Sequence, residues 1–103
     1  MKQECSCETI VKYIKKKTDE KLYDRVQRVV SKDKDSIKDT LIQIIRLQKG
    51  PYKGGQLIVN EEGGLYDLEP NLEATKIALE SGFALRRYIV GNAVVLTNGL
   101  RLG

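Results

Sequence analysis

The sequence predicts an α+β fold in which N-terminal helices pack on a mainly antiparallel sheet of four or five strands. Apolar residues recur at helical spacing through much of the first fifty residues. From residue 54 onward, short apolar runs alternate with glycine-containing turns, which predicts two hairpins. A stretch of helical composition separates these hairpins. The predicted order is therefore three helices, two strands, one helix and two strands.

The first predicted helix covers about Cys7 to Lys17 and places Ile10 and Ile14 on one side. This apolar side points roughly a quarter turn or more away from the apolar residues that follow, so one straight helix cannot bury both sets. We therefore expect a break at Thr18. A threonine can cap the start of a second helix, about Asp19 to Ser31, whose acidic first turn suits the helix dipole.

The second predicted helix separates its apolar and charged faces clearly. Its inward side carries Leu22, Val26, Val29 and Val30. Its cations follow at i, i+4, i+7 and i+11 if the helix extends that far; they are Lys21, Arg25, Arg28 and Lys32. A basic helix face of this kind can follow a phosphate backbone, although pairing with Glu20 and Asp24 is the competing explanation.

The third predicted helix, about Ser36 to Lys49, has the broadest apolar arc and is expected to be the most buried. Gly50 and Pro51 end it. A glycine-rich turn leads to a predicted strand from Gln56 to Asn60, whose return strand is Leu65 to Leu68.

A short helix is predicted from Pro70-Asn71 to residue 81, with Gly82 as its stop. The last hairpin joins Leu85 to Val90 and Ala93 to Thr97 through Gly91-Asn92. That two-residue loop sets a register that pairs Val90 with Ala93, Tyr88 with Val95 and Arg86 with Thr97. Leu100 to Leu102 are expected as a short fifth strand.

The chain of 103 residues is expected to form a single domain, residues 1–103, with a basic helical half (1–50) and a ββαββ half (51–103). The first half carries 13 Lys and Arg against 8 Asp and Glu, and the second half carries 5 against 6. The net charge of +4 therefore belongs to the helical half and favours an anionic partner. Because no apolar run approaches ~18 residues and the start resembles no signal peptide, we expect a cytoplasmic protein without membrane association.

The sequence contains no histidine, the commonest general base, and no motif typical of a catalytic or cofactor site. We therefore expect a non-enzymatic protein without a cofactor. Cys5 and Cys7 are the only candidates for a metal site, and their spacing differs from the usual C-x-x-C. They are interpreted as reduced thiols, so no metal is expected.

The leading hypothesis is a small regulatory binding protein for an anionic partner, most simply nucleic acid. Cationic side chains would bind phosphate and an aromatic ring would stack on bases. The expected residues come from the second helix, the glycine-rich turn and the last hairpin. They are Lys21, Arg25, Arg28, Lys32, Lys53, Arg86, Arg87 and Tyr88.

Two alternatives use the last hairpin differently. In the first, the protein is a homodimeric interaction module, an adaptor or inhibitor of a larger protein, and one face of the hairpin forms its interface. The interface residues would be Tyr88, Val90, Val95 and Thr97. In the second, the protein sequesters nucleotides, with Arg86, Arg87 and the Gly54-Gly55 turn holding phosphate.

Overall fold

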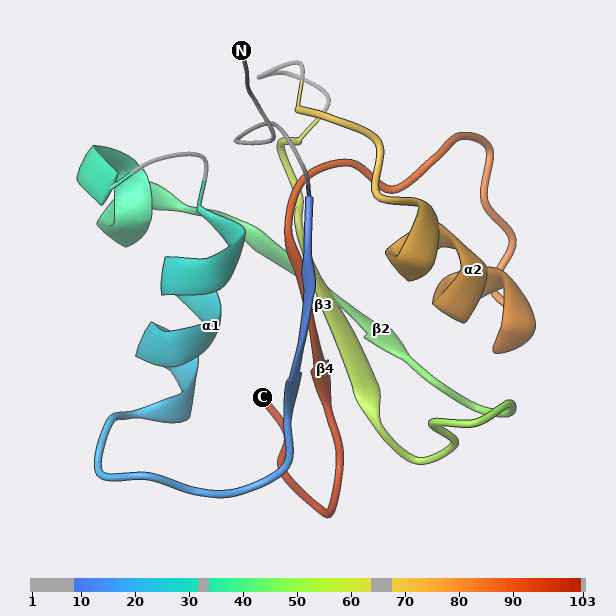
Figure 1. Ribbon diagram of the computed structural model, residues 1–103, viewed down its shortest axis with the longest axis horizontal. Helices are drawn as coiled ribbons and strands as arrows, with labels where there is room; N and C mark the ends of the chain where they lie inside the picture. The colour runs from blue at the N-terminus through green and yellow to red at the C-terminus, as the bar shows by residue number, and fades with distance from the viewer. Residues whose placement is uncertain (1–8, 32–33, 64–67, 103) are drawn as a thin grey trace, which may run out of the picture.

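The chain forms a four-stranded mixed sheet with one α-helix on each face (Figure 1). The computed structural model describes residues 9–31, 34–63 and 68–102. In chain order the elements are β1 (Val11–Ile14), α1 (Leu22–Val30), the 3-10 helix η2 (Lys34–Asp39), β2 (Ile42–Arg46), β3 (Gln56–Asn60), α2 (Leu72–Glu80) and β4 (Ala93–Leu96). Neither α1 nor α2, the α-helices of the described residues, has the length and apolar character needed to cross a lipid bilayer.

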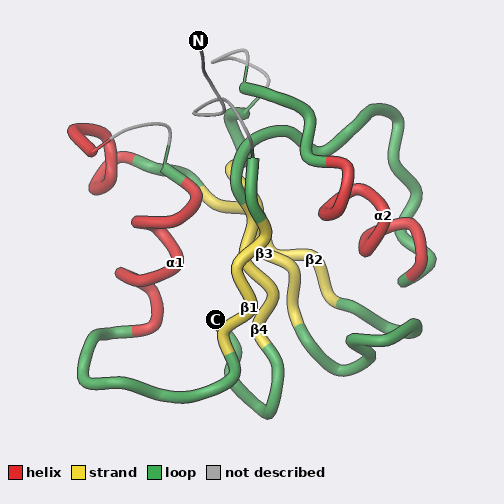
Figure 2. The backbone as a smooth tube through the Cα atoms, in the orientation of Figure 1, coloured by secondary structure: helices red, strands yellow, loops and turns green. Residues whose placement is uncertain are grey.

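The strands lie in the order β1-β4-β3-β2 (Figure 2). β4 runs parallel to β1 and antiparallel to β3, so the last strand in the sequence is an inner strand of the sheet. β2 pairs antiparallel with β3, and Ile44 lies opposite Ile58. β1 and β2 are therefore the two edge strands.

Every residue of β3 and β4 is buried, because helices cover both faces of the inner strands. α1 covers a cluster made of Ile14, Val26, Val30, Ile58, Val94, Leu96, Leu100 and Leu102. α2 contributes to the cluster on the opposite face, which contains Ile45, Leu47, Leu57, Val59, Ala74, Ile77, Ala78, Ile89, Ala93 and Val95. Ala93 and Val95 belong to the cluster on the α2 side and Val94 and Leu96 to the cluster on the α1 side, so both faces of β4 lie in the core.

Four predicted elements are confirmed: the second helix, the strand Gln56–Asn60, the short helix before Gly82, and the strand that begins at Ala93. α1 begins later than expected. Its N-cap is Lys21, which makes no side-chain capping bond, rather than Thr18. α2 begins where the sequence predicts, and Asn71 is its N-cap, because the Asn71 side chain accepts a hydrogen bond from Ala74 N at 3.0 Å.

The prediction of a helix over Cys7 to Lys17 is wrong for the residues that the structure describes. They form strand β1, which pairs with β4. Val11 and Tyr13 pack toward α2, whereas Ile14 packs toward α1. An apolar run this short is compatible with both the helical and the strand period. Pairing with the available edge of β4 favours the strand.

The predicted helix from Ser36 to Lys49 is also wrong. The chain forms η2 and then strand β2. The unusually broad apolar arc belongs to the two faces of a strand: Ile45 lies on the α2 side, and Ile42 packs toward the α1 side. β-branched isoleucines fit this pleated surface better than a helix.

The predicted hairpin around Gly91-Asn92 does not form. Gly91 does adopt a positive φ of 83°, but residues 83–89 are irregular and Val90 makes only an isolated bridge with Pro70. Both edges of β4 are already occupied by β1 and β3. The register that pairs Val90 with Ala93, Tyr88 with Val95 and Arg86 with Thr97 is therefore wrong.

The remaining strand predictions also need correction. Leu100–Leu102 form no strand and are instead tied to β3 by the Gln56 side chain. Leu102 N donates to Gln56 Oε1 at 2.7 Å, and Gln56 Nε2 donates to the Leu102 carbonyl at 3.2 Å. Most of the predicted strand Leu65–Leu68 lies outside the described residues, and Leu68 itself is not in a strand. The sheet is thus mixed, with two of its strands drawn from the first fifty residues.

Asn71 joins three segments in addition to capping α2. Its side chain is almost completely buried, with 2% exposure. Its amide group donates to the carbonyls of Ile10 at 3.0 Å and Gly91 at 2.9 Å. This residue therefore holds the start of α2 against the chain that enters β1 and the turn that enters β4.

We predict that Asn71→Ala lowers the free energy of unfolding by about 2 to 3 kcal/mol, because the cap and the buried bond to the Gly91 carbonyl are lost, whereas the Ile10 carbonyl keeps Ala93 N as a donor. Asn71→Ser retains a capping oxygen and should recover about 1 kcal/mol of that loss. Urea unfolding followed by circular dichroism measures both values. Equal stability of Asn71→Ala and the parent protein would contradict this role.

Candidate functional site

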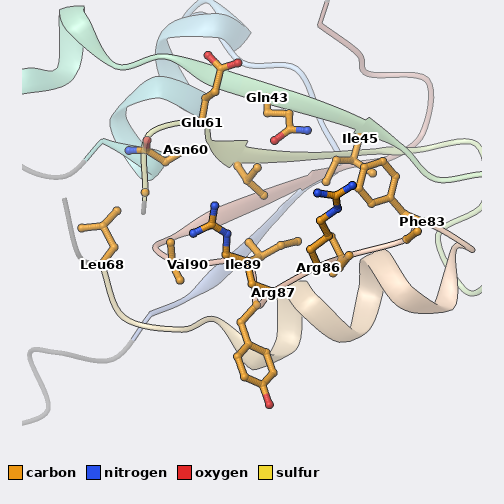
Figure 3. A pocket seen from close by; sticks show the side chains of 15 residues that line it. Gln43, Ile45, Asn60, Glu61, Leu68, Phe83, Arg86, Arg87, Ile89 and Val90 are labelled. Atoms are coloured by element: carbon orange, nitrogen blue, oxygen red, sulfur yellow. The ribbon is translucent and has the colours of Figure 1, made fainter. Parts of the chain in front are cut away.

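A groove of about 680 Å³ lies on the α2 side of the sheet, between strands β2 and β3 and the segment 83–90 (Figure 3). Ile45, Val59 and Ile89 belong to the buried cluster and line its apolar part. Its polar lining includes Gln43, Glu61, Arg86 and Arg87. A volume of this size is typical of sites that bind small molecules or peptide side chains.

The segment 83–90 is held beside α2 at both of its ends. At the end of the helix, Gly82 takes a positive φ of 88° and Phe83 N donates to the Ala78 carbonyl at 3.1 Å. At the start of the helix, Ile89 N donates to Thr75 Oγ1 at 2.9 Å. The segment therefore runs back along α2, and its middle carries Arg86 and Arg87.

Arg86 and Arg87 extend from this segment toward β2 and β3 (Figure 3). Both side chains are exposed, and neither forms an ion pair with a described residue. Glu61 lines the same groove, with Gln43 on the neighbouring strand. The groove therefore presents two available guanidinium groups and a single carboxylate among its described lining residues.

The basic face of α1 is partly neutralised within the protein. The Arg28 guanidinium forms an ion pair with the Glu20 carboxylate, and its hydrogen bonds lower the pKa of Glu20. The same pair raises the pKa of Arg28. Arg25 donates to the Lys16 carbonyl at 3.2 Å, and Lys21 is the exposed N-cap. The competing explanation for this stripe, pairing with nearby acids, thus applies to Arg28.

The expected anion-binding residues do not form one surface. α1 packs on one face of the sheet, whereas Leu85 and Ile89, which flank Arg86 and Arg87, pack on the other (Figure 1). Lys53 is exposed in the turn between β2 and β3, and Lys32 lies outside the described residues. Arg86, Arg87 and Tyr88 line one groove, and Lys21 and Arg25 line a separate, smaller pocket of about 250 Å³.

The residues expected at a dimer interface are also dispersed. Val95 is fully buried in the core and offers no surface to a partner. Val90 and Thr97 are half-buried, and the Thr97 hydroxyl is buried without a hydrogen-bond partner among the described residues. Tyr88 is 60% exposed. It is therefore the one member of this set with a large accessible side chain.

Cys5 and Cys7 lie outside the described residues. Within the described ranges, no three cysteine or acidic side chains gather in a way that could hold a metal ion. Two further groove residues, Gln43 and Phe83, were missed in the sequence. Gln43 and Arg46 both interrupt the apolar run from Leu41 to Leu47, so the local pattern does not single out Gln43 as a groove residue.

Comparisons with protein-family models, with curated proteins and with solved structures found no match to this chain. The chemistry of the groove is therefore the basis for a functional proposal.

A second polar cluster joins β1 to α2 on the same side of the sheet. The Tyr13 hydroxyl donates a hydrogen bond to Glu73 Oε2, and the Tyr13 and Tyr52 rings lie 5.4 Å apart. Burial, and then the hydrogen bond to Glu73, raise the pKa of Tyr13 well above its ordinary value of 10.0. Tyr13 therefore stays protonated at neutral pH, and its hydrogen bond to Glu73 links β1 to α2.

We predict that Tyr13→Phe lowers the free energy of unfolding by about 1 kcal/mol at pH 7. Since the folded protein holds the Tyr13 proton more tightly than the unfolded chain, this contribution is complete below pH 10.0 and declines as the pH rises further. Denaturant unfolding across this range should show the two proteins converging in alkali. A constant difference would rule out the raised pKa.

Proposed function

We propose that this protein is a non-enzymatic binding protein whose anionic partner is held in the groove by Arg86 and Arg87. The observation that carries the proposal is the pair of adjacent arginines that line a groove and form no ion pair with the residues that the structure describes. Both guanidinium groups are exposed beside a partly apolar surface, so a ligand in the groove can pair with them.

The groove suits a guanidinium-mediated interaction. Arginine offers several N–H donors in a planar arrangement that matches a carboxylate or a phosphate in a bidentate way. Ile45, Val59 and the 38%-exposed Phe83 line the space beside these charges. Apolar surroundings limit access of water and strengthen a charge-assisted hydrogen bond.

Glu61 adds selectivity to this site. A uniformly anionic chain that filled the groove would bring negative charge to the Glu61 carboxylate as well as to the arginines. A partner with separated anionic groups and uncharged or donor groups between them avoids that repulsion. The groove consequently favours discrete anionic groups over a continuous line of phosphates, whereas nucleic acid was the simplest partner suggested by charge alone.

The proposal predicts that Arg86→Ala/Arg87→Ala weakens binding of an anionic probe by at least about tenfold, since two charge-assisted contacts are lost. Fluorescence anisotropy with three labelled probes, an acidic peptide, a single-stranded oligonucleotide and a nucleoside triphosphate, measures the affinity and identifies the preferred class. Affinity for the preferred probe should fall as salt is raised.

Arg25→Ala/Arg28→Ala is the matched control, because it removes the same charge from the opposite face of the sheet. This control should bind the preferred probe within about twofold of the parent protein if the groove is the site. If all three probes fail to bind, or if the groove variant binds as well as the parent, the proposed function is wrong. Loss confined to the α1 variant would move the site to the basic helix.

A further inference from the structure

β2 is an edge strand whose outer side has no strand neighbour among the described residues. On its inner side, Glu61 N donates to the Leu41 carbonyl at 2.9 Å and Leu47 N donates to the Gly55 carbonyl at 3.0 Å. Antiparallel ladders alternate with a period of two, so Gln43 and Ile45 belong to the same inward-bonded set. The backbone groups of Ile42, Ile44 and Arg46 therefore point outward.

These outward backbone groups are available for pairing. No described residue hydrogen-bonds to the backbone of Ile42, Ile44 or Arg46 on the outer side. Ile44 is 38% exposed on the α1 face, whereas α1 contacts the inner strands β3 and β4. Exposed edges with apolar side chains are the usual sites at which an extended segment adds a strand.

The same strand borders the groove. Gln43 and Ile45 lie on the α2 face of β2 and line the groove with Arg86 and Arg87. A strand added to β2 would place alternate side chains on each face of the sheet. Those on the α2 face would enter the space beside the arginines, and those on the α1 face would lie beside Ile42 and Ile44.

We infer that the partner is an extended, acidic peptide segment that adds to β2, with its carboxylates facing Arg86 and Arg87 and its aliphatic side chains facing Ile42 and Ile44. This inference rests on the proposed function and names the partner class for the same groove. The positive charge of Arg86 and Arg87 favours acidic side chains on one face of the peptide. The isoleucines of β2 favour aliphatic side chains on its other face. Alternate side chains of an extended peptide are also well separated, so its carboxylates need not form the continuous line of negative charge that Glu61 would repel.

A second copy of this chain fits the edge less well. An antiparallel pair of β2 strands would keep the same faces together and bring both pairs of groove arginines to one side of a continuous sheet. Arg46 of each copy would also lie near the seam. Like charges at such a seam disfavour the pairing, whereas an acidic segment neutralises them.

The test uses the full-length parent protein and a capped peptide of about eight residues in which glutamate alternates with valine. Two derivatives carry N-methyl groups, one on every valine amide and the other on every glutamate amide. Only one set of amides can face β2, so one derivative should lose at least about tenfold in affinity while the other binds like the unmodified peptide. Weaker binding of the peptide methylated at its valine amides indicates antiparallel addition to β2. Weaker binding of the peptide methylated at its glutamate amides indicates parallel addition.

Amide hydrogen exchange gives an independent measurement on the protein. Peptide binding should slow exchange at Ile42, Ile44 and Arg46 by about tenfold or more, and should change Gln43 and Ile45 much less. The latter amides are already bonded to β3 and serve as internal controls.

The outcomes separate the two proposals. If both N-methylated peptides bind like the parent peptide but Arg86→Ala/Arg87→Ala still loses affinity, the groove binds anions without strand addition and only this inference is overturned. If that variant binds the peptide normally, the proposed function fails. A preference for the oligonucleotide, or a β2-mediated dimer in sedimentation equilibrium, would also overturn the peptide assignment.

Discussion

The structure depends on the position of β4, which is bounded on four sides. β1 and β3 occupy its two edges, and the two apolar clusters occupy its two faces. A strand in such a place must be apolar at every position, and Ala93–Leu96 meets that requirement. Once β4 is fixed there, residues 83–90 have no strand to pair with. They lie along α2 instead, and this irregular course creates the groove.

The half-buried Asn92 and the buried Asn60 connect irregular segments and a helix end to this sheet. Asn92 accepts from Ile10 N at 3.0 Å and donates to the Val29 carbonyl at 3.1 Å. Asn60 donates to the Val30 carbonyl at 2.9 Å, which ties the end of α1 to β3. Such side chains satisfy backbone groups where no regular ladder is available. The segment 83–90 is anchored at its ends by the Phe83 and Ile89 amides, whereas residues 84–88 make no hydrogen bond with the described part of the chain.

The parts of the fold that the sequence predicts well are those where local signals agree with the tertiary environment. α2 has an asparagine cap and a glycine stop, and β3 is a short apolar run between turn residues. The sequence predicts helices at β1 and β2 because their short apolar runs are compatible with both the helical and the strand period. Their strand character comes from long-range pairing with β4 and β3, which a local pattern does not contain.

The candidate site was only partly predictable for a related reason. Adjacent arginines at Arg86 and Arg87 are visible in the sequence, and both line the groove. Their separation from the α1 cations depends on which face of the sheet each element covers, which charge counting cannot reveal. Gln43 and Glu61 join them only because β2 pairs with β3. Tertiary pairing therefore determines the composition of the site.

The placement of β4 also sets how the chain reaches its native state. The contact between Ile10 and Asn92 spans 82 residues, and the β1–β4 pairing lies beside it. Forming such a contact costs the chain conformational entropy, because a long loop must close before the sheet is complete. Folding is therefore expected to be slow. Until β4 has been synthesised, β1 and β3 lack their common neighbour. A folding intermediate without β4 would expose an unpaired apolar edge on each of these strands, and such edges promote aggregation.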